Sequence, residues 1–326
     1  MLIPPKYILT PDVSRHLQDI EVARSIIDTI TIPPEVETNI RRQSVLKSSL
    51  FSARIEGNPL TLDEITMRPS KDQKKAEVYN ILKALELVRK RGARDITQSF
   101  LFELHTKVMK GVSGTPAGKF RTEQSAIFNM AGIAIYMPPP YRQIPTLVDR
   151  LLKFVNSDKE KFVPIRAALA HYSFEKIHPF LDGNGRIGRL LFQEVLEKSN
   201  YGMKGLLSVE EYFDKNRIEY YDALMAPERD ITDYIEFMLR ALSNAAQIAK
   251  EQVLKKEKAD PIDFLLPRRA EILLIIKDHT IVNFDMIRRR FMAVNERTLR
   301  YDLLQLQKSG LIKKLGTTKG VYYQAT

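Results

Sequence analysis

Residues 178–189, HPFLDGNGRIGR, interrupt a helical region with a short polar turn. In the segment from Pro164 to Ile177 the apolar residues recur at helical spacing, and its proline falls in the first turn, where the missing N–H costs nothing. Pro179 disfavours helical geometry at His178, so this helix is predicted to end there. The stretch therefore predicts a mainly α-helical fold in which a polar turn joins two helices.

The turn carries the residue types of an anion-binding site. Gly183 and Gly185 leave backbone N–H groups unshielded, and a second helix is predicted to start near Arg186. A glycine-rich turn that runs into a helix N-terminus binds anions. Arg186 and Arg189 add two positive side chains on one face of that helix. The turn therefore predicts a phosphate-binding site.

Two further side chains add chemistry to the turn. Asp182 supplies a hard oxygen ligand suited to Mg²⁺ among phosphates. His178 is the one nearby side chain that can take up a proton near neutral pH. Together they indicate phosphate chemistry with an acceptor hydroxyl. A metal site formed by His171 and His178 is an alternative, because a spacing of seven residues brings the two rings back to nearly the same helix face.

Composition excludes several classes of protein. The 326 residues suffice for about two domains, and 44% apolar with 28% charged residues is typical of a soluble globular protein. The absence of cysteine excludes disulfides, thiol catalysis and cysteine-ligated metals. No apolar run approaches the ~20 residues of a membrane span, and the N-terminus lacks a signal-peptide pattern. We therefore expect a cytoplasmic protein with no membrane partner.

The twelve residues 178–189 match without a gap the motif HPFx(D/E)GNGRxxR, and the chain here resembles the Fic family. The resemblance covers roughly residues 42–240 and implies a Fic-type helical core with a β-hairpin flap at 118–140. It also implies an enzyme that transfers AMP from ATP to a Tyr, Thr or Ser hydroxyl of a target protein and releases pyrophosphate. Self-modification is a further option. Glycine at 185, where kinases of the family carry lysine, favours AMP transfer.

The resemblance also implies individual roles. His178 would be the general base on the target hydroxyl, and Phe180 would anchor the loop. Asp182 would hold Mg²⁺, with Mn²⁺ as an alternative ion, on the α- and β-phosphates. The implied nucleotide contacts are the cradle of Gly183, Asn184 and Gly185, Arg186 at the β-phosphate, Arg189 at the γ-phosphate, and Tyr212, Tyr220 and Tyr221 on a segment similar to the helix that closes the base pocket.

Residues 42–57 read as a short amphipathic helix with Glu56 in its last turn, where a negative charge opposes the helix dipole. Such a placement invites a tertiary partner, although a solvated glutamate is the alternative. The stretch SARIEG, residues 52–57, is similar to the inhibitory motif (S/T)xxxE(G/N) of Fic proteins. By that resemblance Glu56 pairs with Arg189 and displaces the γ-phosphate, while Ser52 supports the arrangement. Removal of AMP, alone or beside transfer, with Glu56 positioning water, is equally compatible.

The flap is predicted as two short strands, Ala126–Phe128 and Ile133–Tyr136, around a turn. A hairpin edge can pair with an extended target segment through main-chain hydrogen bonds. An ordinary hairpin that covers a helical core is the alternative. The residues expected to dock the target are Ile127, Phe128, Ile133 and Ile135.

The two ends of the chain differ from its middle. Residues 1–41 contain five prolines and are predicted to form an irregular arm with a short helix near 13–30. Residues 241–262 suit the exposed end of a long helix followed by a linker. The net charge is +11, and residues 263–326 carry 12 basic and 6 acidic side chains, which suggests a polyanion nearby.

Residues 263–326 have the pattern of a winged helix-turn-helix. Helices are predicted over 267–277 and 284–291 and from Asn295 onward, followed by two strands that flank the turn at 316–319. The domain can bind DNA or serve as a dimer or docking module, so a DNA-binding regulator is the second function class. The residues expected to face DNA are Arg297 and Arg300 in a major groove and Lys313, Lys314 and Lys319 at phosphates.

Overall fold

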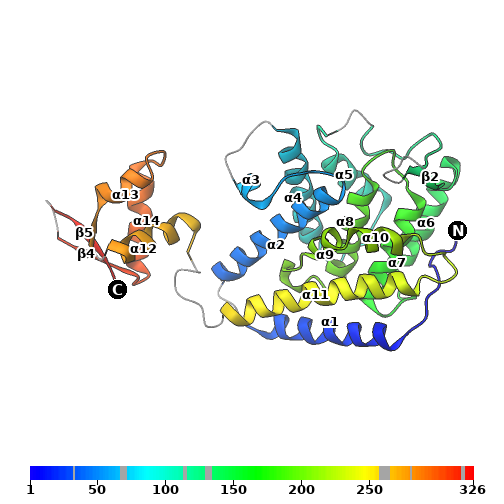
Figure 1. The fold of residues 1–326 in the computed structure, drawn as a ribbon, viewed down its shortest axis with the longest axis horizontal. Helices are drawn as coiled ribbons and strands as arrows, with labels where there is room; N and C mark the ends of the chain where they lie inside the picture. The colour runs from blue at the N-terminus through cyan, green and yellow to red at the C-terminus, as the bar shows by residue number, and fades with distance from the viewer. Residues whose placement is uncertain are drawn as a thin grey trace. The chain divides into compact units, whose positions relative to one another are not determined.

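The computed structural model describes residues 1–31, 34–66, 72–112, 116–128, 134–256, 265–279, 281–316 and 320–326. The described chain is mainly α-helical, which confirms the predicted fold class (Figure 1). It divides into two compact units: unit 1 comprises Met1–Ile30 and Arg41–Glu251, and unit 2 comprises Thr31–Ile40 and Gln252–Thr326. No described helix has the length and apolar character needed to cross a membrane.

Unit 1 is built around two central helices, α7 (Val163–Ile177) and α8 (Asn184–Lys198), which the other elements surround (Figure 1). The surrounding helices are α1 (Pro11–Thr29), α2 (Pro34–Ile55), α3 (Leu62–Thr66), α4 (Gln73–Arg91), α5 (Gln98–Val108), α6 (Ile144–Val155), α9 (Val209–Lys215), α10 (Arg217–Leu224) and α11 (Thr232–Lys256). The residues of α2 up to Ile40 are assigned to unit 2. Short 3-10 turns lie at Tyr141–Gln143 and Met203–Gly205.

The two central helices begin and end close to the predicted positions. Pro164 lies in the first turn of α7, and the helix ends at Ile177, so that His178 takes a left-handed conformation with φ 48°. Helix α8 begins at Asn184, two residues before the expected start at Arg186. The earlier start depends on Gly183, whose φ of 81° lets the chain turn directly into the helix.

The N-terminal region is irregular over residues 1–10 and then forms the helix that was predicted near residues 13–30. Helix α1 spans 19 residues, with Pro11 in its first turn, and the Thr10 hydroxyl accepts a hydrogen bond from the Val13 N–H. It lies alongside α11 (Figure 1), and the Gln247 amide donates to the Asp19 carbonyl at 3.4 Å. Residues 1–30 therefore belong to unit 1. The buried residues of α1, spaced for a helix, are Val13, Ile20, Ala23 and Ile27.

Two helices, α2 and α11, differ from prediction. Helix α2 begins at Pro34, eight residues before 42, because proline is tolerated in a first helical turn. The far end of α11 is packed rather than exposed, because small and apolar residues recur there at helical spacing. The buried residues of that end are Ala245, Ala246, Ala249 and Val253.

The flap is an antiparallel pair of strands, β1 (Ile127–Phe128) and β2 (Ala134–Tyr136). Ile127 pairs with Tyr136 and Phe128 with Ala134, with a shift in register between them. The Tyr136 hydroxyl donates to the Lys176 carbonyl at 3.0 Å, so the hairpin is attached to α7. Residues 129–133, and with them Ile133, lie outside the described residues.

Unit 2 contains α12 (Pro267–His279), β3 (Ile281–Asn283), α13 (Phe284–Arg290), α14 (Glu296–Lys308), β4 (Ile312–Leu315) and β5 (Tyr322–Ala325). The strands form an antiparallel sheet in the order β3-β5-β4, of which β3 was not predicted. Asn295 caps α14 by accepting from the Arg297 N–H at 2.8 Å, as expected. Apart from β3, the order of elements, three helices and then a hairpin, is the one predicted for a winged helix. Lys319 lies outside the described residues.

Candidate active site

His178 occupies the junction between α7 and the polar turn. Its N–H donates to the Phe174 carbonyl at 2.9 Å, which fixes the backbone as the cap of α7. Burial lowers the pKa of the His178 imidazole to about 4, against the opposing effect of the Glu175 carbonyl. The ring is therefore uncharged at neutral pH and can accept a proton.

The turn is held from within by Asn184. Its side-chain carbonyl accepts from the Phe180 N–H at 2.8 Å, and its amide donates to the Phe180 carbonyl at 2.8 Å. Asn184 is 2% exposed, so its side chain shapes the turn from within. Phe180 itself is fully buried, as expected for an anchor.

His105 of α5 packs against the turn, and the sequence analysis did not identify it as a site residue. Its ring stacks on Phe180 with centroids 3.9 Å apart. The Gly118 N–H donates to Nδ1 at 2.8 Å, so Nε2 carries the hydrogen and donates to the Asp182 carbonyl at 3.0 Å. Burial lowers the pKa of His105, which keeps the ring neutral. These partners are 13 to 77 residues away along the chain, so no local pattern could reveal them.

Arg121 connects the flap to the turn, and it too was missed as a functional residue. It is buried, and its N–H donates to the Pro179 carbonyl at 2.9 Å. Its guanidinium donates to the His178 carbonyl at 2.9 Å and to the Pro139 carbonyl at 2.6 Å. One buried arginine thus fastens the segment before β1 and the segment after β2 to the backbone of the turn.

Arg186 lies between two carboxylates. Its Nη1 donates to Glu77 Oε1 at 2.6 Å and its Nη2 to Asp182 Oδ1 at 2.9 Å. Asp182 Oδ1 also accepts from the Gly183 N–H at 2.6 Å, while the Asp182 side chain stays 43% exposed. Glu77, on α4, was not predicted. Asp182 and Arg186 lie together, as the sequence suggested.

Arg189 is fully enclosed and bound to the end of α2. It is 2% exposed, and it donates to the Ser52 hydroxyl at 3.0 Å, the Ser52 carbonyl at 2.9 Å and Glu56 Oε1 at 2.8 Å. Burial alone would raise the pKa of Glu56, but Arg189 and Arg186 outweigh it and lower the pKa. The contact between Glu56 and Arg189 expected from the sequence is therefore present.

The Glu56 carboxylate also sits against the first turn of α8. A Cβ atom added at Gly185 would overlap Glu56 Oε1, so glycine is required for this close approach. Helix N-termini attract negative charge through their free N–H groups and dipole. Glu56 therefore occupies the anion position that the turn creates.

The three tyrosines expected at a nucleotide base lie in different surroundings. Tyr221 is 44% exposed, and its hydroxyl donates to the Ile55 carbonyl at 3.3 Å. Tyr212 accepts from Arg240 Nε at 3.1 Å. Tyr220 is 1% exposed, so the expectation that it contacts the base is wrong. Consecutive helical residues point about 100° apart, which is consistent with a buried Tyr220 beside an exposed Tyr221.

The alternative metal site at His171 and His178 is contradicted by the partners of His171. His171 Nε2 lies 3.0 Å from the Tyr220 hydroxyl and Nδ1 lies 2.7 Å from the Tyr234 hydroxyl. Both ring nitrogens are thus used in hydrogen bonds, and neither is free to bind a metal.

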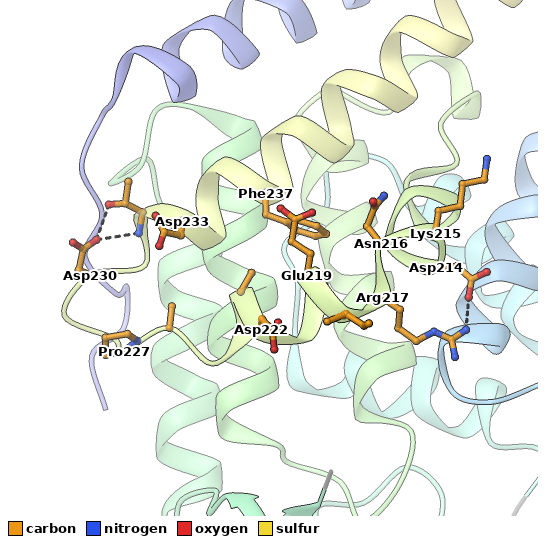
Figure 2. Close-up of a pocket in the computed structure, with 14 residues that line it drawn as sticks. Asp214, Lys215, Asn216, Arg217, Glu219, Asp222, Pro227, Asp230, Asp233 and Phe237 are labelled. Atoms are coloured by element: carbon orange, nitrogen blue, oxygen red, sulfur yellow. Dashed lines mark hydrogen bonds and ion pairs between the residues drawn. The ribbon is translucent and has the colours of Figure 1, made fainter. Parts of the chain in front are cut away.

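A cavity of about 990 Å³ lies beside the site, between α9, α10 and the start of α11 (Figure 2). Asp230, at its rim, accepts from the Thr232 hydroxyl at 2.6 Å, and Asp214 pairs with Arg217. No residue of the turn 178–189 lines it. The charged residues of its lining are mostly acidic, which does not suit phosphates. The carboxylates that line it are Asp214, Glu219, Asp222, Asp230 and Asp233.

Comparison with known proteins places this geometry in context. Residues 95–196 match the model of the Fic/DOC family. Protein adenylyltransferase Fic of Drosophila yakuba is 28% identical over 237 residues, which cover 69% of this chain and 46% of that protein. The same protein of Drosophila melanogaster is 27% identical over 237 residues, with the same coverage. The chain spans about half the length of these curated relatives.

Solved structures share the fold. A Fic family protein from Desulfovibrio desulfuricans G20 aligns with a TM-score of 0.69 at 24% identity, over 99% of this chain and 98% of that one. Fic-1 from C. elegans aligns with a TM-score of 0.59 at 20% identity, over 76% of this chain and 73% of that one. At these identities the likeness concerns the fold alone.

Proposed function

We propose that this chain, which carries a Fic domain, is a protein adenylyltransferase that moves AMP from ATP to a Tyr, Thr or Ser hydroxyl of a target protein. The observation that carries the proposal is the turn 178–189, where a neutral His178 stands beside a helix N-terminus and two buried arginines. The name of the Drosophila relatives and the match to the Fic/DOC model support it.

The proposed reaction is an in-line substitution at the α-phosphorus of ATP. The target oxygen forms a bond to that phosphorus, the bond to the β-phosphate bridging oxygen breaks, and pyrophosphate leaves with the electron pair. His178 takes the hydroxyl proton, for which its uncharged ring is suited. The turn would contribute position and charge, and the contacts of Asn184, His105 and Arg121 keep it rigid.

The phosphates would bind where Glu56 now lies. The N–H groups of Gly183 and Gly185 at the start of α8 would face the phosphates, with Arg186 at the β-phosphate and Arg189 at the γ-phosphate. Arg186 already forms a charged contact with Asp182 at 2.9 Å, so binding would exchange carboxylate partners for phosphate oxygens.

The donor set also fits a divalent cation. Asp182 has a 43% exposed carboxylate at the mouth of the turn, and the described residues contain no group of three or more His, Asp or Glu that could enclose a metal. One carboxylate shared with nucleotide phosphates is the usual way proteins hold Mg²⁺, and Mn²⁺ can take its place. The ion would neutralise phosphate charge, and Asp182 would hold it.

We infer that Glu56 inhibits this reaction. Its carboxylate binds Arg189 and covers Gly185, so ATP cannot place its γ-phosphate on Arg189 while the contact stands. Ser52, one turn earlier on α2, adds two hydrogen bonds that hold Arg189 towards the inhibitory helix. Release of Glu56 would then be the regulated step.

The target and the base would bind at the surfaces beside the turn. The half-buried Ile127 and the 41% exposed Ile135 lie on the flap, where an extended target segment can pair with a strand edge. Phe128 completes that strand. Tyr212 and Tyr221 are the tyrosines left to contact the base.

The test is incubation with Mg²⁺ and α-labelled ATP, with and without a cell lysate. Label on protein should be low for wild type, high for Glu56→Gly and absent for Glu56→Gly combined with His178→Ala. Equal labelling with and without His178 would reject the base role. A folded Glu56→Gly variant that binds ATP but labels nothing, and instead strips AMP from modified protein, would favour AMP removal.

A second proposed function is DNA binding through unit 2, favoured by the free face of α14. Several arginines of this unit are already paired, such as Arg269 with the buried Asp302 at 2.9 Å. Arg297 is exposed on α14, whereas Arg300 lies over the Phe284 ring at 3.9 Å. Lys313 and Lys314 are exposed on β4 and would meet phosphates.

A duplex-binding titration tests this second proposal. We expect an affinity that falls steeply with salt, and a loss of sequence preference on Arg297→Ala. If the chain self-associates and binds no duplex at low salt, unit 2 is instead a dimer module.

A further inference from the structure

The end of α2 is capped by α10. A helix leaves its last four carbonyl oxygens without partners inside the helix, so other groups must donate to them. The Arg54 carbonyl accepts from Arg217 Nη2 at 2.7 Å, and the Ile55 carbonyl accepts from the Tyr221 hydroxyl at 3.3 Å. Arg217 and Tyr221 lie one turn apart on α10, so a single face of α10 caps the end of the helix that carries Glu56.

A cluster of three charged side chains reinforces this cap. Arg54 Nε pairs with Asp214 Oδ2 at 3.1 Å, and Asp214 Oδ1 accepts from Arg217, three residues further along the chain (Figure 2). The Asp214 side chain is 6% exposed, whereas those of Arg54 and Arg217 are 36% and 39% exposed. One enclosed carboxylate therefore holds two arginines, one from α2 and one from α10. We call Arg54, Asp214 and Arg217 the α2 clamp.

The charge of Arg217 suits the end of α2. The C-terminus of a helix carries a partial negative charge, so a cation there stabilises the helix and an anion destabilises it. Arg217 places its guanidinium on a carbonyl of the last turn, whereas the Glu56 carboxylate follows immediately after that turn. The last turn of α2 is therefore expected to depend on its arginine partners, and loss of Arg217 should weaken it.

The clamp is joined to Glu56 through the backbone. The Glu56 N–H donates to the Ala53 carbonyl at 3.0 Å, and the Gly57 N–H donates to the Arg54 carbonyl at 2.9 Å. The Arg54 carbonyl thus accepts both from Arg217 and from the residue that follows Glu56. The backbone that carries the Glu56 carboxylate to Arg189 is therefore the same turn that the clamp holds against α10.

We propose that the α2 clamp keeps Glu56 on Arg189, so that opening the clamp releases the inhibition. The proposal rests on the proposed function, in which Glu56 inhibits AMP transfer. Asp214 and Arg217 are then positioning residues that act through Glu56. Both also line the cavity of Figure 2, so the clamp can be reached from there without opening the turn 178–189.

The experiment opens the clamp with and without Glu56 in place. Arg217→Met keeps the aliphatic length but removes the donors, and Asp214→Asn removes the charge between the two arginines. Both arginines are partly exposed, so neither change leaves a buried charge unpaired. The initial rate of AMP incorporation at low ATP should rise about three- to tenfold with Glu56 present, the range for a partly exposed hydrogen bond at a helix end. In the Glu56→Gly background it should change by less than about twofold, because the clamp then holds no inhibitory group.

A second measurement needs neither ATP nor a target protein. Amide hydrogen exchange is followed at residues 56–58, whose N–H groups donate to the Ala53 and Arg54 carbonyls. Arg217→Met should make this exchange about three- to tenfold faster, because the last turn of α2 opens more often. Arg15→Met is the matched control. Arg15 pairs with Asp12, also three residues earlier, on α1 at 3.0 Å, so neither the rate nor the exchange at 56–58 should change.

The outcomes separate the clamp from the inhibition. A rise in rate that requires Glu56, together with faster exchange at 56–58, supports the proposal. The same change in rate in both backgrounds overturns it, because Arg217 would then act on nucleotide or target directly. Unchanged exchange, or faster exchange without a gain in rate where Glu56→Gly does raise the rate, overturns it as well. If Glu56→Gly itself fails to raise the rate, the proposed inhibition is wrong, and the exchange measurement alone decides whether the clamp holds α2.

Discussion

Exchange of Glu56 is the perturbation for which the structure gives the clearest magnitude. The hydrogen bond from Arg189 Nη2 to Glu56 Oε1 is 2.8 Å long, and the Arg189 side chain is buried, with 2% of its surface exposed. A hydrogen bond to a charged group contributes about 1.5–3 kcal/mol, which corresponds to roughly 10- to 150-fold in an equilibrium. If ATP must displace this contact, Glu56→Gly should raise the transfer rate at low ATP concentration by that factor.

The assay is the initial rate of AMP incorporation below saturating ATP. Glu56→Gln keeps the shape and a hydrogen bond but removes the charge, so its rate should lie between wild type and Glu56→Gly. Glu86, an exposed glutamate of α4, provides the control, and Glu86→Gln should leave the rate unchanged. A Glu56→Gln rate at or below the wild-type rate, with the protein folded, would refute the reasoning, because the charge would not be what restrains Arg189.

Three further predictions concern other residues. In the Glu56→Gly variant kcat/KM should stay level as pH falls through 6.5 and decline only near pH 4, because the base must be uncharged and burial lowers the pKa of His178 to about 4; a decline centred on 6.5 would contradict this. His105→Phe keeps the ring on Phe180 but loses two hydrogen bonds, so it should lower kcat and cost about 1–3 kcal/mol of unfolding free energy in a urea titration. Asp302→Ala leaves Arg268 and Arg269 without their buried partner and should destabilise unit 2 by about 1–3 kcal/mol, read from urea unfolding, with AMP transfer unaffected.

Local signals made much of the fold predictable. Proline at the start of α7, proline after His178 and the glycines of the turn each restrict the backbone near themselves, so the limits of α7 followed from a few neighbouring residues. Asn295, a residue type favoured at helix N-caps, likewise predicted the start of α14. The helix predicted near residues 13–30 is present as α1, and it begins two residues earlier because Pro11 lies in a first turn, where proline is tolerated.

The residues of the site also divide into those that the sequence predicted and those that it did not. The residues of the turn lie close together in the sequence, so their chemistry could be predicted from the residues themselves. The contact of Glu56 with Arg189 could be predicted only from the family resemblance. Glu77 meets Arg186 across 109 positions, and His105 reaches the Asp182 carbonyl across 77. Contacts of this kind arise from how α4 and α5 pack on α8, and a single sequence contains no periodicity that encodes them.

The proposed reaction is tested most directly by following the two ends of ATP separately. The Glu56→Gly variant is incubated with lysate protein and either α-labelled or γ-labelled ATP, and both protein and released phosphates are analysed. AMP transfer predicts that the α-label appears on protein and the γ-label in pyrophosphate, with neither result when His178→Ala is added. A γ-label on protein, or an α-label that stays in free nucleotide while ATP is consumed, would contradict the account.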